Sequence, residues 1–270
     1  MGEGGSAGAD PAALPAGERL GRRREEPVEL EVAVKPLEGA HLCATGAANA
    51  VSAVAMGDLG ALLRVPPGAY MEKLAVGPAA QGAIDLRRPP VENLRRVADA
   101  LGKYVEDLTV VILDRPRHQG LLAAVRETGA RIKLLTDGDL AGALATCFPE
   151  TGVDMLLGTG GAAEGVIAAA AVRCAGGELQ GRLVFKGEVE RERARASGLA
   201  EPDRIRTAEE LAGGSVMFAA TGVTSGDLLR GVVFTGDGGR THSVVMRSRT
   251  ATLRFIDSIH HFTRSPNYGW

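Results

Sequence analysis

A glycine-rich stretch between an apolar run and an alanine-rich segment is the part of the sequence best suited to chemistry. Residues 155–157 are apolar, positions 158, 160 and 161 are glycine, and residues 166–172 are strong helix formers. A strand, a glycine turn and a helix in this order expose N–H groups at the positive end of the helix dipole, which suits phosphate. Glu164 lies at the start of this helix and would repel a phosphate unless a cation lay between them. Alternatively, Glu164 only complements the helix dipole, and the pattern alone leaves both interpretations open.

Two further polar segments each follow a predicted apolar strand. Arg115 and Arg117 come after one such strand, and Asp137 and Asp139 come after the next. Because an open parallel sheet binds its ligand beyond the carboxyl ends of its strands, we expect these side chains and the glycine turn to meet at one crevice. The planar fork of arginine suits phosphate oxygens, and aspartate suits sugar hydroxyls. Any one of these segments could be an ordinary surface turn, but three in succession predict a phosphorylated ligand.

The elements that must position these segments alternate along the middle of the chain. A helix that opens at Pro89–Pro90 and closes at Gly102 is followed by strand–helix units, the last of which contains the glycine turn. This alternation predicts a parallel sheet covered by helices on both faces. The expected strands are 108–113, 132–135 and 155–157, and the expected helices are 90–101, 121–127, 139–147 and 166–172.

Strand patterns dominate on either side of this middle region. The expected strands are 28–34, 49–56, 61–65, 73–76, 215–219, 228–234, 242–246 and 251–261, with Gly57–Asp58 joining the second and third as a hairpin. The charge-dense segment 186–206 is expected to be solvated and at most helical. The patterns predict two α/β domains, a discontinuous strand-rich one from residues 1–91 plus 207–270, and one with a parallel sheet from residues 92–206.

Composition restricts the classes of function. The formal net charge is -2 and aromatic residues make up 4% of the chain, so the sequence offers neither the basic surface nor the aromatic platform of a nucleic-acid-binding protein. No apolar run approaches the ~20 residues that span a bilayer, and the N-terminus lacks a secretory signal pattern. Cys43, Cys147 and Cys174 are scattered without metal-ligand spacing, as is typical of reduced thiols. We therefore expect a cytoplasmic protein without nucleic-acid or membrane partners.

Several segments together resemble the class II fructose-1,6-bisphosphatases, members of the lithium-sensitive sugar and inositol phosphatase superfamily. In this sequence the matching segments are Tyr-Met-Glu-Lys-Leu at 70–74, Arg-Pro-Arg-His at 115–118, Asp-Gly-Asp at 137–139, Gly-Gly-Ala-Ala-Glu-Gly at 160–165, Thr-Gly-Val-Thr at 221–224 and Ser-Ile-His at 258–260. The resemblance runs over nearly the whole chain, and the combination of motifs is highly specific.

The resemblance implies an α/β fold, the layered sugar-phosphatase fold (αβαβα), with the first N-terminal helices missing. It also implies metal-dependent hydrolysis of fructose 1,6-bisphosphate to fructose 6-phosphate and phosphate, as in gluconeogenesis and glycerol metabolism, with Mg²⁺ or Mn²⁺ as cofactor and a homo-oligomer as assembly. Glu3 and Glu164 would be metal ligands, and Glu164 would also be catalytic. The implied substrate-binding residues are Glu38, Gly39, Tyr70, Arg115, Pro116, Arg117, Asp137, Gly138, Asp139 and Gly161.

Two catalytic positions depart from the family pattern. Where the family has a metal-binding aspartate and a threonine that helps to activate water, this chain has Lys35 and Ala40. Lys35 brings a positive charge to a cation site, although its long stem could instead carry the charge to solvent. Near the start, Glu3 keeps one carboxylate of the family and Gly5 replaces another. Either the true start lies upstream and Lys35 is tolerated, or the enzyme is impaired; the alternative is a catalytically inactive sugar-phosphate-binding homologue or partner subunit.

Overall fold

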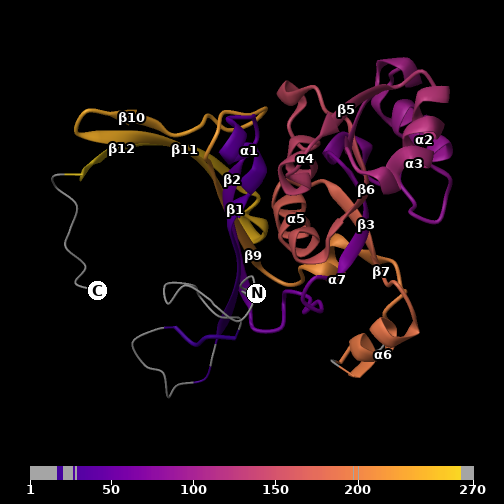
Figure 1. Ribbon diagram of the computed structural model, residues 1–270, viewed down its shortest axis with the longest axis horizontal. Helices are drawn as coiled ribbons and strands as arrows, with labels where there is room; N and C mark the ends of the chain where they lie inside the picture. Colours follow the sequence, from indigo (N-terminus) through magenta and orange to yellow (C-terminus); the bar gives the residue numbers. More distant parts are fainter. Residues whose placement is uncertain (1–16, 21–26, 28, 197, 200, 263–270) are drawn as a thin grey trace.

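The computed structural model describes residues 17–20, 27, 29–196, 198–199 and 201–262. Within these ranges two six-stranded sheets lie face to face with helices between them, and further helices cover the outer face of the second sheet (Figure 1). The layered α/β fold expected from the sequence is therefore confirmed. No helix in the described ranges is long and apolar enough to cross a membrane.

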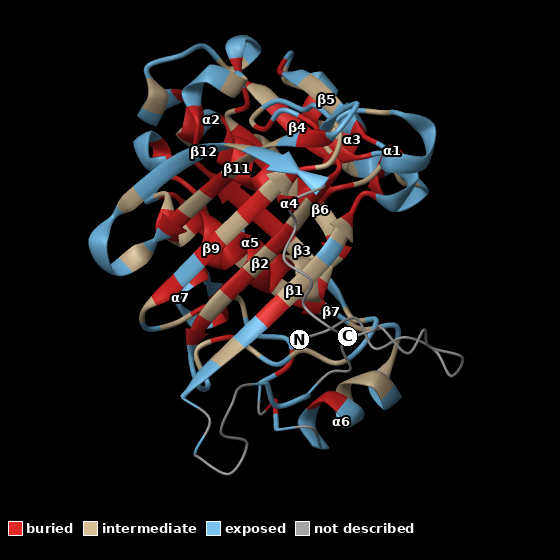
Figure 2. Ribbon diagram, turned by 90° about the vertical axis from the view of Figure 1, so that its left-hand side faces the viewer, coloured by how far each residue is buried: buried red, intermediate tan, exposed pale blue. Residues whose placement is uncertain are grey.

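The first sheet is antiparallel. Its order is β1-β2-β9-β11-β10, and β12 pairs with β11 as well. Residues along β2 alternate between buried and half-buried, as expected for a strand with one face against the core. Buried residues concentrate in the middle of this sheet, whereas β12 is mostly exposed (Figure 2). The strands are β1 (Leu30–Glu38), β2 (Val51–Asp58), β9 (Val216–Gly222), β10 (Val233–Thr235), β11 (Gly238–Arg247) and β12 (Thr252–His261).

The second sheet is mixed rather than parallel, which corrects the expectation from the sequence. Only β4 pairs in parallel, with β5 on one side and β6 on the other. The strand expected at 73–76 begins earlier and inserts between β6 and β7, antiparallel to both. The order is β5-β4-β6-β3-β7-β8. The strands are β3 (Tyr70–Val76), β4 (Thr109–Leu113), β5 (Arg131–Leu135), β6 (Met155–Gly161), β7 (Glu178–Val184) and β8 (Arg206–Thr207).

The helices expected in the middle of the chain are present. Pro90 opens α2 at its first turn, and Gly102 ends it in the left-handed conformation with φ of 62°. Helices α2 and α3 lie outside the second sheet, and α4, α5 and α7 lie between the two sheets (Figure 1). The helices are α1 (Ala40–Thr45), α2 (Pro90–Leu101), α3 (Gln119–Glu127), α4 (Asp139–Ala145), α5 (Ala162–Cys174), α6 (Glu188–Ala196) and α7 (Ala208–Leu211).

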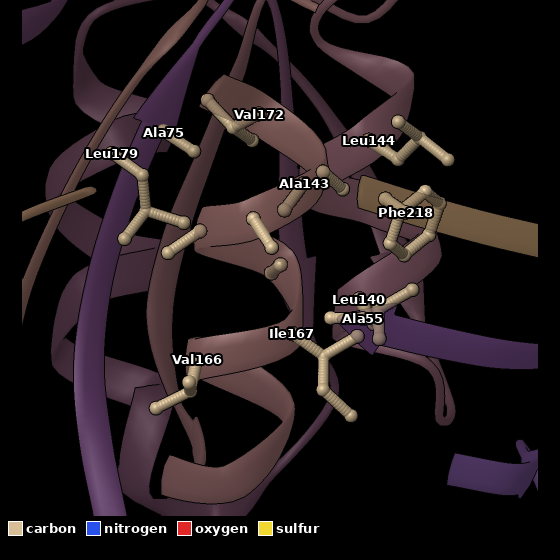
Figure 3. Close-up of a cluster of buried hydrophobic side chains, with 14 of the residues drawn as sticks. Ala55, Ala75, Leu140, Ala143, Leu144, Val166, Ile167, Val172, Leu179 and Phe218 are labelled. Carbon is tan, nitrogen blue, oxygen red and sulfur yellow. The ribbon is translucent and has the colours of Figure 1, made fainter. Parts of the chain in front are cut away.

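Helix α5 is the centre of the core. Ten of its 13 residues are buried, and residues 165–172 carry only small or apolar side chains, so this part of the helix is stable only inside the protein. It contacts β1, β2, β9 and β11 of the first sheet and β3, β6 and β7 of the second. Val166, Ile167 and Val172 pack among side chains from both sheets, including Phe218 and Leu179 (Figure 3). Its alanine run lets both sheets approach closely.

Two of the expected strands differ from the structure: the strand expected at 61–65 does not form a hairpin with β2, and the strand expected at 228–234 is shorter than predicted. Segment 61–65 is not the second arm of a hairpin with β2, because β1 and β9 occupy both edges of β2. Among the described residues its ladder contact is the bridge from Leu62 to Ala212, and the Leu62 N–H donates to the Glu31 carboxylate at 2.6 Å. The strand expected at 228–234 is reduced to β10, because the preceding residues form a turn in which the Gly226 N–H donates to the Leu229 carbonyl.

Candidate functional site

The glycine segment forms the end of a strand rather than a turn, which corrects the expected phosphate-cradling loop. β6 runs through Gly160 and Gly161, and α5 begins at the next residue. A β-carbon on Gly160 would lie 1.9 Å from Asp139 Oδ2, and one on Gly161 would lie 1.9 Å from Glu164 Oε2. A side chain at either glycine would therefore have to displace a carboxylate that lies against the backbone.

A lysine meets the carboxylate at the start of α5. Lys35 on β1 places its Nζ 2.9 Å from Glu164 Oε1 and 4.0 Å from Glu38 Oε2. The side chains of Lys35 and Glu164 are 13% and 18% exposed, so this pair is mostly removed from water and the lysine does not swing out to solvent. Burial alone would raise the pKa of Glu164, but the hydrogen bond from Lys35 and the charges of Lys35 and Lys73 hold this pKa below its usual value.

A second lysine lies deeper, in the middle of the second sheet. Lys73 on β3 is 1% exposed. Its Nζ lies 2.5 Å from Asp139 Oδ2 and donates to the Gly161 carbonyl at 2.8 Å. A buried ammonium persists only with such partners, because an unpaired charge away from water is very costly. Asp139, at the first turn of α4, is thereby engaged with Lys73 and is itself buried.

The third carboxylate of this cluster holds a proton at neutral pH. Burial, with the negative charges of Asp139 and Glu164, raises the pKa of Glu38 to about 8, although the positive charges of Lys35 and Lys73 lower it. With Glu38 neutral, two ammonium groups face two carboxylates and the cluster carries no net charge. We call Lys35, Glu38, Lys73, Asp139 and Glu164 the charge cluster.

Glu38→Gln is expected to stabilise the protein at neutral and higher pH. The pKa of Glu38 is about 8 in the folded state, against 4.5 as its ordinary value, so only the folded state keeps the proton between these values. The free energy of unfolding therefore falls as pH rises from about 4.5 to about 8, by at most about 3 kcal/mol at neutral pH. Glutamine removes this loss.

Urea unfolding of both proteins between pH 5 and pH 9 measures the effect. The two curves should meet near pH 5 and separate as pH rises, with the variant the more stable. Glu127→Gln, at an exposed position on α3, is the matched control and should follow the original chain throughout. Parallel curves for Glu38→Gln and the original chain would contradict the assigned proton.

Arg117 joins two of the sequence motifs and the residue that precedes a third. Its guanidinium donates twice to the Thr159 carbonyl, at 3.1 and 2.7 Å, and lies over the Tyr70 ring with 5.1 Å to the centroid. Arg115 donates to the carbonyls of Asp114 and Thr136, at 2.8 and 2.7 Å. These acceptors carry no formal charge, so the positive charges of both arginines remain available to an anionic ligand.

Two residues of this site were not identified from the sequence. Lys73 is one, and the signal for it was a charged residue in the middle of an otherwise buried strand. The other is His118, which is 3% exposed. Its Nε2 accepts from the Thr159 N–H at 2.8 Å and its Nδ1 lies 2.7 Å from the Leu113 carbonyl, an arrangement that assigns the proton to Nδ1. His118 thus fixes the Arg117 loop against β6.

The remaining predicted site residues lie at helix starts near the cluster. Gly39 and Gly138 cap α1 and α4 with φ of 80° and 83°, in the left-handed region that glycine tolerates. Ala40 is the first residue of α1, and Asp137 accepts from the Gly138 N–H at 3.0 Å. Pro116 begins the single helical turn that carries Arg117. Glu3 lies outside the described residues.

The described residues provide few free ligands for a metal ion. Among them, no group of three or more His, Cys, Asp or Glu side chains is arranged to hold one. The carboxylates of Glu164 and Asp139 are each paired with a lysine instead. The geometry therefore combines a cluster balanced by ammonium groups with two arginines that donate to uncharged carbonyl groups.

Comparison with known proteins gives one family. Residues 1–260 match the family model described as bacterial fructose-1,6-bisphosphatase, glpX-encoded. The chain is 46% identical over 251 residues to a D-fructose 1,6-bisphosphatase class 2/sedoheptulose 1,7-bisphosphatase of Synechococcus sp. (strain JA-3-3Ab), covering 88% of this chain and 72% of that protein. It is 42% identical over 257 residues to the protein of the same name from Microcystis aeruginosa (strain NIES-843 / IAM M-2473), covering 90% and 74%.

Proposed function

We propose that this chain, which belongs to the family of bacterial, glpX-encoded fructose-1,6-bisphosphatases, hydrolyses fructose 1,6-bisphosphate to fructose 6-phosphate and phosphate. The observation that carries the proposal is the position of Arg117. Its contacts to Tyr70 and Thr159 bring the 115–118 and 70–74 segments together beside the start of the 160–165 segment. Lys73 of the charge cluster lies on the same strand as Tyr70, β3. Arg115 and Arg117 bind phosphate oxygens, as their forked guanidinium groups suit.

The names of the relatives include a second substrate, sedoheptulose 1,7-bisphosphate. Both substrates are sugar bisphosphates that differ in the length of the carbon chain. Release of inorganic phosphate from each of them, measured with the purified chain, tests the proposed activity directly. Absence of release from both would favour the alternative, a sugar-phosphate-binding homologue or partner subunit without turnover, which the Lys35–Glu164 pair supports.

Proteins of this family are generally metal-dependent. For this chain the resemblance predicts Mg²⁺ or Mn²⁺, held by Glu3 and Glu164. Magnesium demands a near-octahedral set of oxygen ligands, and a carboxylate engaged by a lysine is a poor one. The residues that the structure describes therefore do not by themselves fit a divalent ion, so we assign the phosphate contacts to the chain's own cationic side chains.

Three wider properties complete the proposal. The net charge of -2 and the three free cysteines support a cytoplasmic protein without nucleic-acid partners. Exposed Phe234, Ile259 and Phe262 on and beside the β10–β12 part of the first sheet support a homo-oligomer. We keep the division into residues 1–91 plus 207–270 and residues 92–206, with β3 as the strand that joins the second sheet from before residue 92.

Arg117→Ala is expected to weaken binding of fructose 1,6-bisphosphate by about 1.5–3 kcal/mol, as for the loss of a hydrogen bond to a charged group. Isothermal titration calorimetry with the purified chain measures this. Arg126→Ala removes the same charge from an exposed position on α3 and should leave the affinity unchanged. Equal affinities of Arg117→Ala and the original chain would remove Arg117 from the site.

A further inference from the structure

We propose that the Lys35 ammonium occupies the cation position beside Glu164, so that this chain excludes a divalent metal there and binds its sugar phosphate without one. The inference rests on the proposed function for the identity of the ligand. It concerns the position between β1 and the start of α5, which contact each other.

At this position the Lys35 ammonium lies where a cation bound to Glu164 would lie. Lys35 Nζ lies 2.9 Å from Glu164 Oε1, and Glu38 Oε2 is 4.0 Å from the same nitrogen. Both partners of the close pair are mostly buried, so water screens their attraction only weakly. A metal ion that used this carboxylate would have to displace the ammonium from a site that the strand and the helix have already formed.

The second ion pair strengthens the exclusion. Asp139 is held by the buried Lys73 at 2.5 Å, so two of the three carboxylates in the charge cluster already have a cation at hydrogen-bonding distance. A divalent ion entering the cluster would meet two ammonium groups. Among the described residues, no group of three or more His, Cys, Asp or Glu side chains is arranged to hold it. Both lysines would have to move before the ion could gain an oxygen-rich coordination shell.

Lys35 also offsets the repulsion between Glu164 and a phosphate at the start of α5. The N-terminus of this 13-residue helix favours an anion, yet Glu164 in its first turn carries a negative charge that would repel a phosphate. Lys35 neutralises that charge at a distance of 2.9 Å. An ammonium group is also a binder of phosphate in its own right, as a compact point charge. A phosphorylated sugar can therefore approach without a metal between it and Glu164.

The test uses the full chain, freed of metal with EDTA. Binding of Mn²⁺ is followed by electron paramagnetic resonance of the free ion, without any sugar present. We expect no saturable binding by the unmodified chain up to millimolar Mn²⁺. We expect Lys35→Asp to gain one Mn²⁺ site, because it replaces the ammonium with an oxygen ligand beside Glu164. Lys35→Met, which removes the charge without adding a ligand, is the matched control and should gain much less.

Calorimetry then measures fructose 1,6-bisphosphate binding in EDTA and in MnCl₂. The unmodified chain should show affinities within about twofold of each other, whereas Lys35→Met should lose at least about tenfold in EDTA. Saturable Mn²⁺ binding to the unmodified chain that Glu164→Gln abolishes would overturn the inference, as would sugar-phosphate binding that requires MnCl₂. If no sugar phosphate binds in either buffer, the proposed function and the ligand part of the inference are wrong, and the Mn²⁺ titration alone decides which cation occupies the position.

Discussion

Lys73→Met is expected to lower the free energy of unfolding by about 3–5 kcal/mol, because it leaves the buried Asp139 carboxylate without its cation. The Lys73 ammonium is 1% exposed and also donates to the Gly161 carbonyl, so no water can replace it. Urea denaturation at neutral pH, followed by circular dichroism, measures the loss.

Two control variants separate the lost ion pair from a general effect of removing a lysine. Lys186→Met changes an exposed residue and should alter stability by no more than about 0.5 kcal/mol. The double variant Lys73→Met with Asp139→Leu removes both charges and should recover much of the loss, since an apolar pair of similar volume can replace a buried ion pair. If Lys73→Met alone costs less than about 1 kcal/mol, the pair is not the buried contact described.

The double change Lys35→Asp with Ala40→Thr is expected to raise metal-dependent phosphate release by about 100-fold or more. It restores the two side chains that the family pattern has at these positions, and a bound metal can contribute several kcal/mol of transition-state stabilisation. The unmodified chain should turn over far more slowly than the ~10 s⁻¹ typical of enzymes. Phosphate release from fructose 1,6-bisphosphate, with Mg²⁺, with Mn²⁺ and with EDTA, measures both.

The single change Ala40→Thr is the control for the hydroxyl alone. It should gain little, because Lys35 remains 2.9 Å from the carboxylate that a metal would use. The double variant should also melt at a higher temperature with MnCl₂ than with EDTA, since three carboxylates would then face Lys73 alone, with the protonated Glu38 beside them. An unmodified chain that already turns over at about 10 s⁻¹ would show that Lys35 does not impair the reaction.

Local patterns were enough to predict most elements of the second sheet. Pro90 and Gly102 mark the ends of α2, and the apolar runs of β4, β5 and β6 are found where the sequence places them. The direction of β3 was not predictable in this way. A short apolar strand carries no sign of whether it pairs in parallel or antiparallel, since this depends on partners that are distant in sequence.

The kinds of side chain in the candidate site were predicted from the sequence, but the ion pairs between them were not. The sequence indicated that Glu164 needs a cation if phosphate is to bind beside it. It could not identify the cation, because Lys35 is brought to α5 only by the packing of β1 against that helix. The same limit applies to Gly160, which looks like a residue of a flexible turn but lies in β6 pressed by Asp139.

The position of α5 between the sheets also restricts how the protein can move. Hinged enzymes open and close two bodies across a modest and rather polar boundary. Here a single helix, buried on all sides, contributes to the packing of both sheets. Rotating one sheet away from the other would bring Val166, Ile167 and the alanine run into water. A ligand must therefore enter and leave through rearrangement of side chains, such as that of Arg117, and of loops. Lys35 and Glu164 would keep their positions relative to each other during this movement.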